Sequence, residues 1–151
     1  MSRWILLIAG FLAFPFLEHM FRGAGLISFF AIVTLVLHGG LGQHVFLVVV
    51  FFMSIVLDIT FHLGLGTHLL SISGMLLFTS LLNRVFPSDN LVSRGILDIL
   101  VFTFYTVLFS LLISLQSGTG LSILSWYLLG TSIVKAVLGM ILYRTGVWLI
   151  S

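Results

Sequence analysis

The feature that most constrains this chain is a series of long apolar runs, broken only by glycines, prolines and single charges. A membrane-spanning helix needs about 20 mostly apolar residues, and several of these runs approach that length. The runs are continuously apolar rather than alternating, which favours helices over a β-barrel. We therefore predict an all-α integral membrane protein, a single domain over residues 1–151. The expected bundle of six transmembrane helices covers residues 4–17, 26–37, 44–57, 67–82, 93–115 and 121–143.

Composition supports the membrane assignment and limits the function. Hydrophobic residues make up 60% of the chain and charged residues only 7%, whereas a soluble domain carries about 25% charged residues. The basic residues are scattered singly, so neither nucleic-acid binding nor a polybasic lipid-binding patch is expected. The chain has no cysteine, which excludes disulfides, cysteine-ligated metals and thiol nucleophiles.

The positions of the basic residues predict the orientation in the membrane. Lys and Arg near the ends of spans prefer the cytoplasmic side. In a six-span topology with a cytoplasmic N-terminus, the C-terminus is cytoplasmic too. Four arginines then lie on the cytoplasmic side, namely Arg3, Arg84, Arg94 and Arg144, and one arginine, Arg22, lies outside. In the alternative, a five-helix bundle, the short segment 26–37 lies in the interface, which places Arg84 and Arg94 opposite Arg3.

Ionisable side chains at membrane depth are costly and are therefore candidates for function. In the six-span topology such residues gather near the outer ends of the spans: Glu18, His19, Asp58, His62 and His68. Asp58 and His62 are four residues apart, so on a continuing helix they share a face and can hydrogen-bond or bind a metal. We favour a structural role, with Asp58 fixing a turn that contains Gly64 and Gly66, because no spacing matches a strong metal motif.

Two further patterns are more typical of packing than of chemistry. The run 71–74 (SISG) superficially resembles the GxSG motif of intramembrane serine proteases. It lacks the first glycine, and no histidine follows in a later span, so a serine–histidine dyad is not expected. In the fifth segment a polar stripe is expected to mark helix–helix contact rather than a substrate path. The stripe consists of Thr103, Thr106, Ser110 and Ser114.

The sixth segment contains the least expected residue of the chain. Lys135 lies inside an apolar run. It either extends to the cytoplasmic interface or pairs with a carboxylate such as Asp98, and the sequence leaves both alternatives open. On the same segment Ser132, Ala136 and Gly139 form a face of small residues suited to close helix packing.

The middle of the chain resembles a known family. Residues 54–70 read SIVLDITFHLGLGTHLL. This stretch resembles the central signature of the rod-shape-determining membrane protein MreD, in which an apolar helix ends in an aspartate and a Leu-Gly turn leads into the next span. Asp58 and Gly66 fall on that pattern, and Ser54 represents the small residue that precedes the aspartate in the family.

A second stretch extends the resemblance towards the C-terminus. Residues 130–135 (GTSIVK) are similar to the Pro-Thr-x-x-x-Asn run of the family, in which Thr131 matches while Gly130 and Lys135 differ. The resemblance covers about residues 44–143, together with total length and hydropathy.

The resemblance implies a non-enzymatic scaffold of the bacterial inner membrane. Members of this family are similar in fold to the substrate-binding membrane subunits of energy-coupling-factor transporters. They belong to the elongation (rod) complex, which regulates cell shape and lateral peptidoglycan synthesis. They link the coiled-coil protein MreC to the actin-like MreB filament and the cell-wall synthases, and no catalytic residue or cofactor is implied.

An alternative function comes from the outer polar cluster. A substrate-binding subunit of an energy-coupling-factor-type transporter would bind a vitamin or a metal there, through residues such as Glu18, Asp58, His62 and His68. A bound small molecule in the purified protein would distinguish this alternative from the scaffold.

Overall fold

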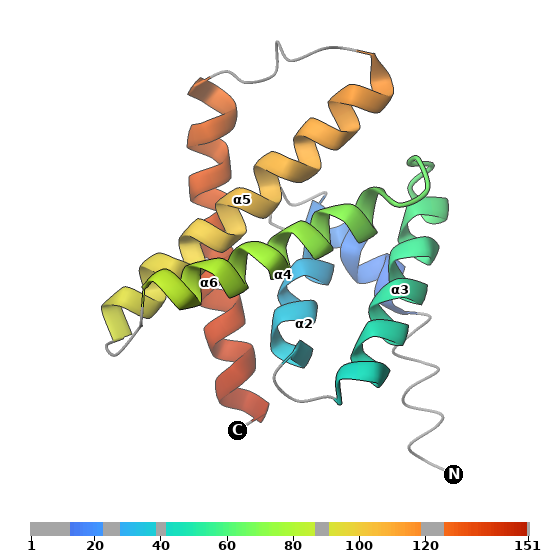
Figure 1. The fold of residues 1–151 in the computed structure, drawn as a ribbon. Coiled ribbons are helices and arrows are strands. Elements are labelled where there is room, and N and C mark those ends of the chain that lie inside the picture. The colour runs from blue at the N-terminus through green and yellow to red at the C-terminus, as the bar shows by residue number, and fades with distance from the viewer. Residues whose placement is uncertain (1–12, 23–27, 39–41, 87–90, 119–125, 151) are drawn as a thin grey trace.

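The computed structural model describes residues 13–22, 28–38, 42–86, 91–118 and 126–150. Within these residues the structure is all-helical (Figure 1). Residues 13–22 form a first helical segment. The labelled helices that follow are α2 (Phe29–His38), α3 (Gln43–Thr60), α4 (Thr67–Val85), α5 (Leu91–Ser117) and α6 (Trp126–Ile150).

The helices lie where the apolar runs predicted them, but every described helix ends later than predicted, by the largest margin in α6. The first segment remains helical to residue 22, past both predicted ends, residue 17 and the alternative at residue 20. The last helix continues to Ile150, although the sequence predicted an end near Tyr143. Arg144 does not end α6, because its side chain turns back to an aspartate of α5. The predicted beginnings at residues 4 and 121 lie outside the described residues.

Two of the described helices are long and apolar enough to cross a membrane. These are Gln43–Thr60 and Val92–Ser117. Helix α2 has only 10 residues, which at 1.5 Å per residue is about 15 Å, or half of a hydrocarbon core of about 30 Å. The sequence left open whether segment 26–37 spans the membrane, and the described helix is too short to span it alone.

Side-chain contacts show that successive helices run in opposite directions. Arg22, at the end of the first segment, contacts His68 at the start of α4, so the first segment and α3 end on the same side. Gln116, at the end of α5, contacts Gly64 on that side as well. The opposite side joins the start of α5 to the end of α6, through Asp98 and Arg144.

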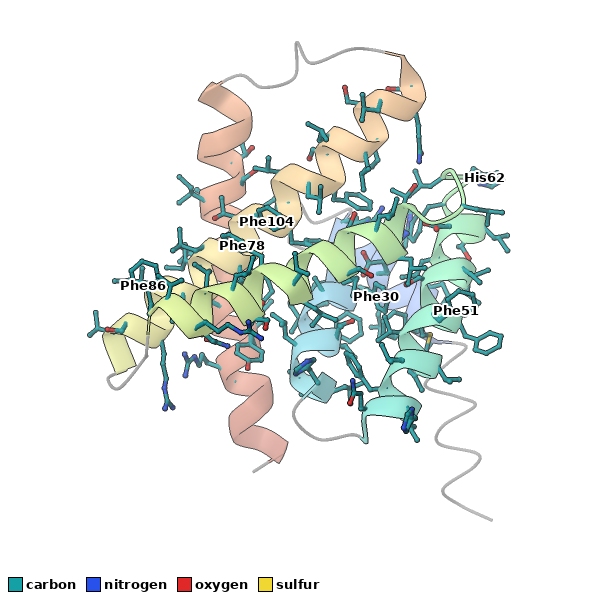
Figure 2. The ribbon with its side chains drawn as sticks, in the orientation of Figure 1. Phe30, Phe51, His62, Phe78, Phe86 and Phe104 are labelled. Atoms are coloured by element: carbon teal, nitrogen blue, oxygen red, sulfur yellow. The ribbon has the colours of Figure 1, made fainter. Side chains whose placement is uncertain are left out.

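The outer surface of the bundle is apolar and its interior holds charged side chains. Phe51 points away from α3 whereas Phe30 is buried in the interior (Figure 2). Phe78 of α4 stacks on Phe104 of α5 with ring centroids 4.3 Å apart. Soluble monomers rarely expose apolar patches of more than a few hundred Å². The distribution is typical of a helical membrane protein.

Candidate functional site

Asp58 is the residue from which the candidate site is built. It lies in the last turn of α3 and is completely buried. Its Oδ2 accepts a hydrogen bond of 2.6 Å from the backbone N–H of Gly66, and its Oδ1 accepts one of 3.1 Å from that of His68. These N–H groups belong to the start of α4, where the helix dipole also favours a negative charge. The carboxylate of one helix therefore holds the first turn of the next.

His68 connects Asp58 to an arginine. Its Nδ1 lies 2.5 Å from Asp58 Oδ1, and its Nε2 lies 2.6 Å from an Nη2 of Arg22. A guanidinium can only donate, so Nε2 accepts and the ring proton is on Nδ1, from which it is donated to Asp58. The imidazole is completely buried and lies 5.1 Å from the ring of Phe109. This arrangement requires a neutral histidine.

Arg22 and Glu18 complete the set. Arg22 Nε donates to Glu18 Oε1 at 2.8 Å, one turn earlier in the same helical segment. The second carboxylate oxygen of Glu18 accepts the backbone N–H of Phe30 at 2.8 Å, which ties the segment to α2. The guanidinium also lies over the rings of Phe61 and Phe109, 4.7 and 4.5 Å from their centroids. We call Glu18, Arg22, Asp58 and His68 the buried polar cluster.

The turn between α3 and α4 is held from a third helix. Gln116, near the end of α5, accepts the N–H of Gly64 at 3.1 Å and donates to Thr67 Oγ1 at 2.7 Å. Thr67 Oγ1 in turn donates to the carbonyl of Gly64 at 2.6 Å. Gly66 has a φ of +92°, a conformation that glycine adopts without cost. The sequence analysis did not identify Gln116. The one feature that could have indicated it is its polar amide at the end of a long apolar helix.

Two histidines of the predicted outer cluster lie elsewhere. The favoured role of Asp58, fixing the turn at Gly66, is present. The alternative in which Asp58 pairs with His62 is wrong, because α3 ends at Thr60 and His62 adopts a left-handed φ of +53° in the turn that follows. His62 is exposed. His19 is exposed too, and its ring stacks on Phe61 at 6.1 Å. Among the described residues, no three histidine, aspartate or glutamate side chains converge as a metal site would require.

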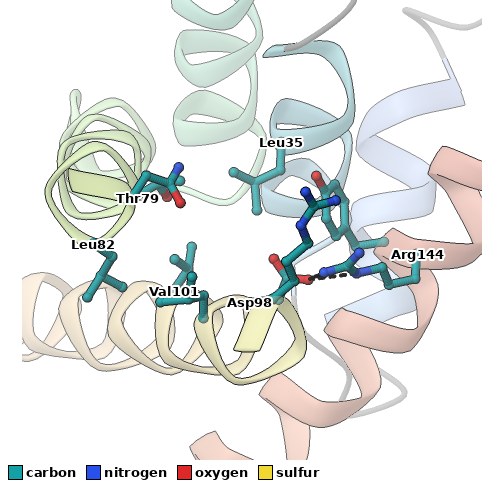
Figure 3. A pocket seen from close by; sticks show the side chains of 10 residues that line it. Leu35, Thr79, Leu82, Asp98, Val101 and Arg144 are labelled. Carbon is teal, nitrogen blue, oxygen red and sulfur yellow. Dashed lines mark hydrogen bonds and ion pairs between the residues drawn. The ribbon is translucent and has the colours of Figure 1, made fainter. Parts of the chain in front are cut away.

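Lys135 does not pair with Asp98. The Asp98 Oδ2 accepts from Arg144 instead, at 2.8 Å from Nε and 2.6 Å from Nη2, as the dashed line in Figure 3 marks. This pair borders a cavity of about 300 Å³ between α2, α4, α5 and α6. Lys135 lies at a different cavity, of about 220 Å³, which it shares with Arg22.

Most of the small and hydroxyl residues that the sequence singled out on α5 and α6 are either buried or line the cavity next to Lys135. In α6, Ser132, Ala136 and Gly139 are all buried. In α5, Ser114 is buried, whereas Thr106 and Ser110 line the cavity next to Lys135. Ser73, the serine of the protease-like run, is exposed on α4.

The buried polar cluster is a set of mutually paired groups. Every carboxylate oxygen of Glu18 and Asp58 accepts a hydrogen bond, and both ring nitrogens of His68 are engaged. Such a set suits the positioning of helix ends, because each group is already satisfied by another helix or by backbone. Comparison of the chain with protein-family models, with curated proteins and with solved structures finds no match.

Proposed function

We propose that this protein is a non-enzymatic scaffold of the bacterial elongation complex, of the MreD type, in the inner membrane. One observation carries the proposal. The two residues that fall on the family signature, Asp58 and Gly66, are in direct contact through a 2.6 Å hydrogen bond. Because these two residues bind each other and join the end of α3 to the start of α4, the signature has a structural role. A structural role of the signature supports a scaffold.

The proposed topology has six membrane crossings with both termini in the cytoplasm. Alternating helix directions support it over five crossings, since α2 runs back from the side where Arg22 lies even though its described part is short. The Asp98–Arg144 pair then lies towards the cytoplasm, and the buried polar cluster towards the periplasm. Positive residues favour this orientation.

The surfaces available for partners are apolar helix faces. Helix α3 contacts α4 and α2 in the bundle, and its other face exposes Leu47, Val48, Phe51 and Phe52. A transmembrane helix of an MreC-like protein can pack on such a face. Through MreC, the scaffold would act indirectly on MreB and on the cell-wall synthases.

Co-purification and depletion test this proposal. We expect an MreC-like protein to co-purify with the tagged chain from membranes in mild detergent, and depletion to turn rods into round cells. Complementation should succeed with Thr60→Ala, an exposed position near the end of α3, and fail with Asp58→Ala at equal expression. Normal rod shape after depletion, without a co-purified partner, would refute the scaffold.

Native mass spectrometry of the same preparation addresses the transporter alternative. A scaffold is expected to carry a partner protein. A bound vitamin or metal that Asp58→Ala removes would favour the substrate-binding subunit instead.

A further inference from the structure

The cavity next to Lys135 has the composition of an anion site. It has a volume of about 220 Å³ and lies between the start of α2, the middle of α5 and α6. Its lining includes two cationic side chains, Arg22 and Lys135, and three hydroxyl residues that can donate: Ser28, Tyr105 and Ser110. No aspartate or glutamate is among the described residues that line it.

Lys135 lacks a counter-charge within the part of the chain that the structure describes. Its side chain is half-buried, and no described residue forms a hydrogen bond or ion pair with its ammonium. Glu18 binds Arg22 of this cavity, and Asp98 binds Arg144 at the other cavity. A cation in an apolar bundle is costly unless an anion or other acceptor compensates it.

The Tyr105 hydroxyl is a second, independent indication of a ligand. Tyr105 is 2% exposed, and its hydroxyl has no hydrogen-bond partner among the residues that the structure describes. Ser28 lies near this hydroxyl but not in hydrogen-bonding geometry. Buried hydroxyls are nearly always paired, because an unpaired one loses its hydration without compensation. An acceptor in the cavity would satisfy Tyr105 and Lys135 together.

Arg22 contributes donors that are already fixed in place. Its guanidinium has five N–H groups, of which the bonds to Glu18 and His68 use two. The rings of Phe61 and Phe109 lie against it and hold its plane. A ligand that binds the remaining N–H groups therefore does not have to order this side chain, which lowers the entropic cost of binding.

We propose that this cavity binds a phosphate group, either free or in the headgroup of an anionic phospholipid. The donors come from three directions, namely from Arg22, from α5 and from α6. A tetrahedral group with several acceptor oxygens can reach all three, whereas a planar carboxylate has only two oxygens. Charge-assisted hydrogen bonds from Arg22 and Lys135 provide most of the affinity. Basic pockets between transmembrane helices bind lipid headgroups in this way.

The test uses the full chain in detergent and two kinds of probe. Native mass spectrometry compares phosphatidylglycerol with diacylglycerol of the same acyl chains, which lacks the phosphate. Thermal unfolding compares inorganic phosphate with chloride at equal ionic strength. The key variant is Lys135→Met, which keeps an unbranched side chain, one atom shorter, and removes the charge. The matched control is Arg84→Met, in the exposed last turn of α4.

We expect wild-type protein to bind at least one phosphate probe, and Lys135→Met to weaken that binding about tenfold or more. Arg84→Met should have no effect. Binding of phosphatidylglycerol alone identifies a headgroup, and stabilisation by inorganic phosphate identifies a free anion. Tyr105→Phe, which removes one hydroxyl, should weaken binding about threefold or more, and it serves if Lys135→Met does not fold. Absence of binding to both probes overturns the proposal, as does an equal loss in Arg84→Met.

Discussion

Replacing Asp58 by alanine should be among the most damaging substitutions in this chain. The carboxylate accepts hydrogen bonds from the N–H of Gly66, from the N–H of His68 and from the imidazole of His68. Each hydrogen bond to a charged group contributes about 1.5–3 kcal/mol. Removing the carboxylate leaves these three donors buried without an acceptor, and each unpaired donor costs about 1–3 kcal/mol.

These contributions are not additive, so we expect the free energy of unfolding to fall by about 3–5 kcal/mol. Asp58→Asn should also be destabilising. An amide offers one acceptor oxygen, and its NH₂ group would face an N–H of the α4 first turn. The loss should therefore be smaller than for alanine but well above that of a surface change.

Equilibrium unfolding in mixed micelles of dodecylmaltoside and SDS measures this difference. Thr60→Ala is the matched control, two residues along the same helix, with an exposed hydroxyl that bonds only to the carbonyl of Val56. Surface substitutions of this kind change stability by about 0.5 kcal/mol or less. If Asp58→Ala unfolded at the same SDS fraction as Thr60→Ala, the assignment of Asp58 as the link between α3 and α4 would be wrong.

Two glycine substitutions test the turn itself by thermal unfolding in detergent. Gly66→Ala should destabilise by about 1–2 kcal/mol because its φ is +92°, whereas Gly42→Ala, at an ordinary φ with nothing within 4 Å, should be nearly neutral. Equal midpoints would contradict the strain argument. A Cβ at Gly64 would lie 2.6 Å from Gln116 Nε2, so Gly64→Ala should cost less when Gln116→Ala is already present. A cost that is the same in both backgrounds would show that the amide does not limit the space there.

The positions of the helices follow closely from the sequence, because in a chain this apolar a helix ends mainly where glycine, proline or charge interrupts the run. Helix α4 was predicted from Thr67 and begins there. The end of α6 was missed for a physical reason. Arg144 reads as a boundary residue when considered alone, yet it continues the helix because Asp98, 46 residues away, neutralises it.

The sequence predicted the members of the candidate site and the contact of Asp58 with the glycine turn, but not the contacts between the charged side chains. Glu18, Asp58 and His68 stood out as ionisable groups among apolar residues, and the structure brings them together. Helical spacing also offered His62 as a partner for Asp58, but the helix ends between them and the chain returns with His68 instead. Periodicity describes neighbours within a helix, and a pairing across a turn depends on the path of the turn.

The few charged groups of this chain have a role that its many apolar ones cannot fill. In lipid, leucine and phenylalanine faces offer little preference for one neighbouring helix over another. A polar pair does favour one arrangement of two helices, because a shift of one helix along the other leaves both polar groups without a hydrogen-bond partner. The buried polar cluster fixes the first segment, α2, α3 and α4 at one end, and the Asp98–Arg144 pair fixes α5 and α6 at the other. With internal register set by these contacts, the outward apolar faces are free to suit partner helices, which is the requirement of a scaffold.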